Sequence, residues 1–285
     1  MEFRQAKETD ISGIRDLWKR CFGDEDDYLN FYIKEAYRPS RTWLCADGTL
    51  PISMMTLLPA CVEDGESYYQ GGYVYAVATL PEYRHQGLMS QLHERVEEAC
   101  KKEGFSFLSL VPAELSLFSM YRKLGYEVCA QLYYDTVSKK DGKLFSAKTC
   151  FEPIRPEQFL DYRLSYLRRQ GAFLRLQDDC WEYTEKELSA AGYSYLGIEN
   201  KLGKGYLVYH INKIGHLRIR EAGVPEDCLR AAIGDICRYF EVPEFFIKLP
   251  WGGFSGKENR RPFAMMKKLN ATVPGQVYTN LMLDD

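Results

Sequence analysis

One short segment carries residues whose types and order suit the binding of a phosphate group. It runs from Val77 to Met89 and reads as a strand that turns into a helix near Gly87. The first turn of a helix leaves backbone N–H groups unpaired, and together with the helix dipole they attract anions. Gly87 has no side chain to keep a ligand from the backbone, and the guanidinium of Arg84 adds donors. The segment therefore predicts a diphosphate site. It lacks the Gly-Lys-Ser/Thr ending of a P-loop and the G-x-G-x-x-G pattern of a dinucleotide fold, which excludes both classes.

Two ordered motifs resemble those of the GNAT superfamily of N-acetyltransferases. Residues 80–89 (LPEYRHQGLM) resemble its acyl-CoA-binding signature, R/Q-x-x-G-x-G/A, with Arg84 and Gly87 in place and Met89 where the family has Gly or Ala. Residues 118–127 (FSMYRKLGYE) resemble its second motif, in which a Tyr stands four residues before a Gly and an aromatic residue. The resemblance covers about residues 1–137, and two motifs in the right order are more specific than either alone.

The resemblance implies acetyl-CoA as co-substrate and assigns roles by position. Backbone groups of Val77 and Thr79 would pair with the amides of pantetheine. The main chain of six consecutive residues would hold the pyrophosphate, namely Arg84, His85, Gln86, Gly87, Leu88 and Met89. Tyr121 would protonate the departing thiolate. Its pKa of about 10 lies above a thiol's pKa of about 8.5, so the phenol can share its proton as negative charge builds on sulfur. The implied reaction is acetyl transfer to a primary amine by direct attack.

The group that deprotonates the amine stays open at this point. Glu114 follows the strand expected at residues 105–111 and is one candidate; it stands where the family often has Asn. The terminal carboxylate after Leu281–Asp285 is the other candidate, because in the related enhanced-intracellular-survival type acetyltransferases the chain terminus reaches the active site.

Each of these residues also has a simpler structural interpretation. Arg84 and Gly87 fit a surface arginine and a helix-start glycine, and Tyr121 fits a core aromatic in a chain with 21 tyrosines. The acidic run Asp24–Asp27 is typical of a helix N-terminus, with attraction of a cationic amine as the alternative. His93 lies on a helical apolar stripe and is interpreted as structural. The four scattered histidines predict no metal site.

The motifs lie on alternating strands and helices, which predicts an α/β fold with a mixed sheet and a β-α-β crossover. In the first half, strands are expected at 3–6, 42–46, 52–62, 72–80, 105–111 and 126–137, and helices at 11–21, from 24 onward, at 86–103 and at 115–124. In the second half, helices are expected at 155–170, 178–191, 225–240 and 260–269, and strands at 193–199, 205–211, 215–221, 244–250 and 276–283.

The two halves show the same order of elements, and residues 118–125 (FSMYRKLG) match residues 263–270 (FAMMKKLN) in register. We therefore expect tandem GNAT-like domains, with a catalytic domain at 1–140 and a degenerate one at 150–285. This arrangement resembles the N-terminal part of the enhanced-intracellular-survival type enzymes. The second half has the acidic turn Val224–Asp227 where the first half is basic, so it is expected to complete the acceptor pocket or a homodimer surface rather than to bind CoA.

Composition sets the remaining limits. Of 285 residues, 46% are hydrophobic and 27% charged, and the net charge of −3 argues against a dedicated nucleic-acid binder. Nine cysteines without a C-x-x-C pair are typical of reduced core residues. With no signal peptide and no membrane-spanning apolar run, a cytoplasmic protein acting on a small-molecule or peptide amine is expected. Two alternatives stay open: a CoA-binding regulator without turnover, and a transferase that uses a longer acyl or an aminoacyl donor.

Overall fold

The computed structural model describes residues 1–141, 148–254, 259–269 and 273–280. In the first half, each expected strand and helix is present within a few residues of its predicted bounds. The elements are β1 (Glu2–Gln5), α1 (Ile11–Phe22), α2 (Asp26–Glu35), β2 (Thr42–Asp47), β3 (Leu50–Asp64), β4 (Ser67–Thr79), α3 (Leu88–Lys102), β5 (Phe107–Leu110), α4 (Leu117–Lys123) and β6 (Glu127–Ser138).

The second half contains every expected helix and strand except the last two elements, and it has two additional short strands. It contains β7 (Cys150–Ile154), α5 (Pro156–Leu167), β8 (Phe173–Leu176), α6 (Asp178–Ala190), β9 (Ser194–Asn200), β10 (Gly203–Ile211), β11 (Leu217–Gly223), α7 (Glu226–Tyr239), β12 (Glu244–Leu249) and β13 (Arg260–Lys268). The short strands β7 and β8 were not expected. In place of the strand expected at 276–283, the described part of that segment has only an isolated bridge between Tyr278 and Phe173.

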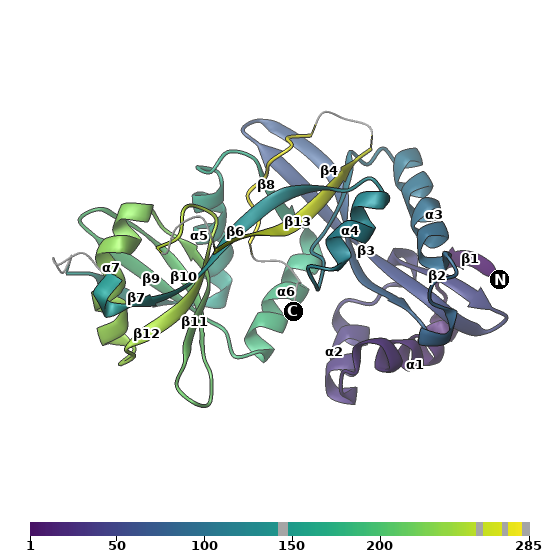
Figure 1. Cartoon of the computed structure of the whole chain (residues 1–285), viewed down its shortest axis with the longest axis horizontal. Helices are drawn as coiled ribbons and strands as arrows, with labels where there is room; N and C mark the ends of the chain where they lie inside the picture. Colours follow the sequence, from purple (N-terminus) through teal and green to yellow (C-terminus); the bar gives the residue numbers. More distant parts are fainter. Residues whose placement is uncertain (142–147, 255–258, 270–272, 281–285) are drawn as a thin grey trace.

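The strands form one mixed sheet in the order β1-β2-β3-β4-β5-β13-β6-β12-β11-β10-β9-β7, with β8 pairing with β3. In Figure 1 the long strands β6 and β13 run between a lobe that holds α1, α2 and α3 and a lobe that holds α7. In the first lobe, α1, α2 and α6 pack on one face of the sheet and α3 and α4 on the other, each over its own apolar cluster.

The helix expected at residues 260–269 is a strand, and this prediction was wrong. Residues 263–266 are buried without interruption, and β13 is inserted between β5 and β6 with helices or loops over both faces. Ala, Met and Lys have good helix propensity, but burial on both faces of a central strand outweighs it. The proposed match between 118–125 and 263–270 therefore compares a helix with a strand and carries no weight for duplication.

The tandem arrangement rests on topology instead. In the first half, antiparallel β3 and β4 lead into α3 and then into β5, which pairs in parallel with β4. In the second half, antiparallel β10 and β11 lead into α7 and then into β12, which pairs in parallel with β11. The proposed division at about residue 140 stays a prediction, and the pairing shows that β8 and β13 complete the sheet of the first half.

The structure also bears on the cysteines, on membrane-spanning helices and on metal-binding clusters. The nine cysteines carry no disulfide, and seven of them are buried, whereas Cys150 is exposed. No helix in the described part of the chain is long and apolar enough to cross a membrane. Within the same residues, no cluster of His, Cys, Asp and Glu is arranged to hold a metal ion.

Candidate active site

The turn between β4 and α3 is exposed and has the backbone conformation of an anion site. After a short helical turn at Pro81–Tyr83, His85 and Gly87 take left-handed φ values of 63° and 76°, and α3 begins directly after Gly87. Within the described residues, this helix has no side-chain cap at Gly87, which leaves N–H groups of its first turn without a capping partner. Residues 84–87 face solvent. We call residues 84–89 the anion-binding turn, after the role that the sequence predicts for them.

Arg84 folds back over the end of β4. Its Nε donates a hydrogen bond to the carbonyl of Thr79 at 3.0 Å, and the thiol of Cys21 lies 3.4 Å from the same oxygen. The Thr79 carbonyl is therefore engaged within the protein. Of the two residues expected to pair with pantetheine, Val77 is the better placed, because it lines a cavity described next.

Strands β4 and β5 separate beyond their first three pairs, and a cavity of 390 Å³ occupies the gap. The ladder between β4 and β5 ends at Tyr73 and Ser109. Farther along, β4 carries a bulge against β3 at Ala76, whose φ of 51° is left-handed, and such a bulge bends the strand. The lining residues come from both faces of the sheet: Trp18, Phe22, Asp24, Tyr28, Tyr73, Val74, Tyr75, Ala76, Val77, Leu110, Val111, Ala113, Leu117 and Tyr121.

Tyr121 of α4 lines this cavity from the face covered by α3 and α4. Its side chain is 6% exposed and its ring packs edge-on against Tyr126, with centroids 5.7 Å apart. The described residues give its hydroxyl no hydrogen-bond partner. Burial raises the pKa of Tyr121 to about 12, so the phenol holds its proton at every pH at which an acetyl transfer is normally assayed.

Glu114 is not brought to the cavity. It is exposed, and its Oε2 accepts a hydrogen bond from the hydroxyl of Ser116 at 3.1 Å. The neighbouring residues Ala113 and Leu117 line the cavity and Glu114 does not. The alternative candidate for the base, the carboxylate after Leu281–Asp285, lies outside the described residues.

The acidic run at 24–27 contains one residue that fits each interpretation made from the sequence, attraction of an amine and a helix N-terminus. Asp24 lines the cavity and accepts a hydrogen bond from Trp18 Nε1 at 2.7 Å. Asp26, in contrast, forms ion pairs with Lys19 at 2.6 Å and with Arg15 at 3.3 Å at the start of α2. One carboxylate of the run is therefore available to a ligand, and a second one serves the helix.

Sequence reasoning missed a cluster of hydroxyls behind Asp24. Tyr28 of α2 and Tyr75 of β4 line the cavity, and their hydroxyls lie 3.1 Å apart. Both contact Tyr183 of α6, and Tyr28 also donates to Glu187 of α6. No local motif marks these residues. Tyr183 and Glu187 reach Tyr28 and Tyr75 only because α6, from the second half of the chain, packs against the first half.

His93 is structural, as interpreted from the sequence. It is 1% exposed and its Nε2 lies 2.8 Å from the hydroxyl of Tyr126. Burial, with a smaller contribution from Lys267, lowers the pKa of His93 to about 4.

The corresponding turn of the second half differs as its sequence suggests. Glu226 opens α7, pairs with Arg230 at 2.7 Å and lines a 950 Å³ cavity together with Glu152, Asp161 and Glu199. The same cavity is also lined by Arg169 and Lys204, so the expectation that only the first half binds CoA stays a prediction.

In comparison with known proteins, the family model covers the first half of the chain, whereas similar solved structures cover nearly all of it. Residues 2–129 match the family model described as an acetyltransferase (GNAT) domain. No curated protein sequence matches the chain. A GCN5-related N-acetyltransferase from Kribbella flavida is 16% identical with a TM-score of 0.72, and the match covers 94% of this chain and 72% of that one. Eis1 from Mycobacterium abscessus is 12% identical with a TM-score of 0.73, over 95% and 74% of the two chains. A protein from Enterococcus faecalis described as a probable N-acyltransferase is 16% identical with a TM-score of 0.75, over 94% and 72%. At these identities the structural similarity shows the fold alone.

Proposed function

We propose that the protein transfers an acetyl group from acetyl-CoA to a primary amine, because residues 2–129 match the family model described as an acetyltransferase (GNAT) domain. Such a domain supports acyl transfer in general. The observation that carries the finer proposal is the cavity in the β4–β5 gap. It is lined by Tyr121 from one face of the sheet and by aromatic and acidic side chains from the other.

The donor side of the site has the groups that a nucleotide diphosphate and a pantetheine arm require. The anion-binding turn offers unpaired amides at the start of α3, and Arg84 lies beside them. Beyond Tyr73, the edge of β4 that faces β5 has no ladder partner. An amide-containing arm can add to such an edge as a strand would, next to Val77. Acetyl-CoA supplies an acetyl group activated as a thioester.

Tyr121 supplies the proton for the leaving group. As the amine nitrogen bonds to the acetyl carbon, the carbon–sulfur bond breaks and negative charge collects on sulfur. Because its pKa is raised, Tyr121 is protonated before the step and can give its proton to the sulfur, and the proton that the nitrogen loses as the amide forms restores the phenol. Its hydroxyl has no partner among the described residues and is therefore free to turn toward the sulfur.

The acceptor side of the cavity suits a cationic amine. Trp18, Tyr28 and Tyr75 present aromatic surface to the cavity, and aromatic faces attract an ammonium group. Asp24 is the only charged residue that lines this cavity in the described part of the chain, and it is acidic. A primary ammonium group is thus attracted to the position from which it attacks.

The test is acetylation by the purified full chain. With acetyl-CoA and a panel of primary amines (n-butylamine, cadaverine and lysine amide), we expect CoA release together with an acetylated amine detected by mass spectrometry. Binding of acetyl-CoA without turnover on any amine would favour a regulator. Faster CoA release with longer acyl-CoA donors would show that the transferred group is a longer acyl group and not acetyl.

A further inference from the structure

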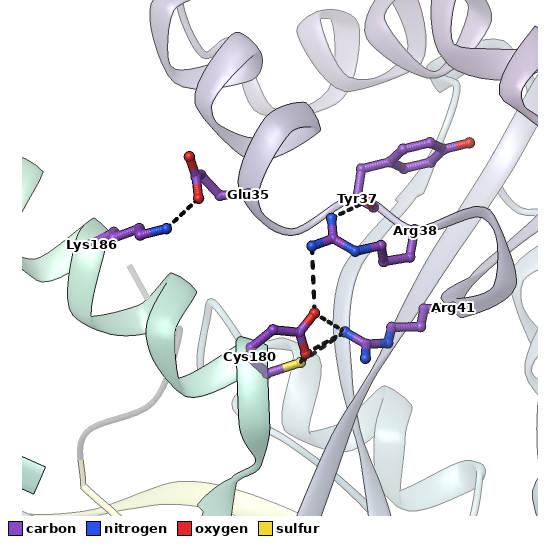
Figure 2. A network of polar contacts seen from close by, with 7 residues as sticks. Glu35, Tyr37, Arg38, Arg41, Cys180 and Lys186 are labelled. Atoms are coloured by element: carbon purple, nitrogen blue, oxygen red, sulfur yellow. Dashed lines mark hydrogen bonds and ion pairs between the residues drawn. The ribbon is translucent and has the colours of Figure 1, made fainter.

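Helix α6 comes from the second half of the chain and is fixed against the first half by ion pairs. Lys186 pairs with Glu35 of α2 at 2.6 Å, and Asp179 pairs with Arg41 at 2.9 Å and with Arg38 at 3.5 Å. Figure 2 shows these contacts along one side of α6, with Arg38 and Arg41 reaching it from the segment before β2. The helix therefore has a set position relative to α2.

This position places a carboxylate behind the cavity. Glu187 Oε1 lies 2.5 Å from the hydroxyl of Tyr28 and 3.4 Å from that of Tyr183. The hydroxyls of Tyr28, Tyr75 and Tyr183 lie 3.1 to 3.3 Å from one another. Since Tyr28 and Tyr75 line the cavity, an unbroken chain of hydrogen bonds leads from the cavity to Glu187.

We propose that Glu187 takes up the proton that the acceptor ammonium must lose before it attacks, and that the hydroxyl of Tyr28 passes this proton on. The ammonium gives one proton to the Tyr28 oxygen while Tyr28 gives its own hydrogen to the Glu187 carboxylate. The amine becomes neutral, the carboxylate becomes a carboxylic acid, and Tyr28 ends as a phenol. This inference rests on the proposed function and supplies the base that Glu114 does not provide.

The surroundings of Glu187 favour a relay through neutral phenols rather than through ionised tyrosines. Among the described residues, the hydroxyls of Tyr28 from α2 and Tyr183 from the same helix donate to Glu187, and the hydroxyl of Tyr75 from β4 contacts both of them. Burial, together with the charge of Glu187, raises the pKa of each of the three tyrosines. They stay phenols, so Tyr28 acts by exchanging one proton for another.

Three further charged groups lie near the relay: an ion pair and one carboxylate. The Lys186–Glu35 ion pair is formed one residue away on α6, and its two charges offset each other. Asp24 lines the same cavity and already accepts the indole N–H of Trp18. Asp24 is the rival base, and the experiment includes it.

The experiment measures kcat/KM against pH for the full chain, with acetyl-CoA and the best amine of the panel. For Glu187→Gln we expect a loss of about a hundredfold near pH 7, in the range for loss of one general base. The loss shrinks as pH approaches the pKa of the amine, about 10, because the free amine then needs no base. Glu182→Gln, an exposed change on the same helix, serves as the matched control and leaves the profile unchanged.

A double-mutant cycle tests the path. Tyr28→Phe alone is expected to lose about as much as Glu187→Gln, and the double variant no more than either, because both belong to one relay. Acetyl-CoA affinity stays at the wild-type value in all three, since none of these residues lies at the anion-binding turn.

Several results would overturn the relay. They are a Glu187→Gln profile that matches wild type, a loss equal at every pH, additive losses in the cycle, or the predicted profile appearing in Asp24→Asn instead. A wild-type chain that turns over no amine would overturn the proposed function itself. The two failures are distinguishable, because this one is seen in the wild type and a failure of the relay is seen only in the variants.

Discussion

Replacing Tyr121 with Phe removes one oxygen from the cavity and little else. Because the hydroxyl has no hydrogen-bond partner among the described residues, its loss leaves no buried polar group unsatisfied. The free energy of unfolding is therefore expected to change by less than about 0.5 kcal/mol. The expected loss in kcat is about 10²- to 10⁴-fold, the usual range for a general acid, which corresponds to about 3–5 kcal/mol of transition-state stabilisation.

The pH dependence of the wild type adds an independent check. Burial raises the pKa of Tyr121 to about 12, and the protonated form is the active one. The rate therefore does not fall between pH 8 and pH 10, as it would begin to do for a phenol of ordinary pKa. The assay is the release of CoA thiol under saturating donor and amine, with thermal unfolding recorded for each variant.

Tyr126→Phe is the matched control. Tyr126 is a buried tyrosine in edge-on contact with Tyr121, but its hydroxyl bonds His93. Its removal is expected to cost about 1–3 kcal/mol of stability, because His93 is left without its partner, while kcat stays near wild type. A wild-type kcat in Tyr121→Phe, or equal losses of kcat in both variants, would refute the assignment of Tyr121 as the acid.

Two further predictions concern α3. Gly87→Ala and Gly104→Ala both place a side chain at a left-handed residue at an end of this helix, with φ of 76° and 80°. Each is expected to lower the free energy of unfolding, measured with denaturant, by about 1–2 kcal/mol. Only Gly87→Ala is expected to weaken acetyl-CoA binding in calorimetry as well, and equal affinities of the two variants would contradict the place of Gly87 in the site. For His93, the folded-state pKa of about 4 lies below the unfolded value of 6.5, so the unfolded chain binds more protons on acidification. About 3 kcal/mol of stability is thus present above pH 6.5 and lost as pH falls to 4. Urea unfolding at pH 7 and pH 4.5 should show a smaller loss in His93→Gln, and identical losses would refute the assignment.

Local patterns predicted the part of the fold that local physics determines. The stripe of apolar residues on α3 and a helix start near Gly87 were both predicted from the sequence, and the structure has the helix within two residues of its expected start. The exposure of the anion-binding turn agrees with the same reasoning.

Long-range pairing was not predictable in this way. Residues 263–266 have the composition of a helix, and only the open position between β5 and β6 makes them a strand. The four-residue strand β8 exists because β3 extends far enough to pair with it.

The same limit applies to the site. Val77 and Tyr121 lie within recognisable motifs, and the structure brings both to one cavity. Tyr183 and Glu187 lie more than 100 residues farther along the chain than Tyr75, on a helix with no motif. Their proximity to Tyr28 depends on how the two halves pack, which spacing in a single sequence does not encode.

The central claim is that the backbone of residues 84–89 binds the diphosphate of coenzyme A. The most direct measurement is calorimetric titration of the full chain with acetyl-CoA and with acetyl-pantetheine, which lacks the nucleotide diphosphate. We expect acetyl-CoA to bind roughly a hundredfold more tightly, a difference of about 2.7 kcal/mol, with the difference reduced in Gly87→Ala. Equal affinities for the two compounds, or no heat with acetyl-CoA, would contradict the claim.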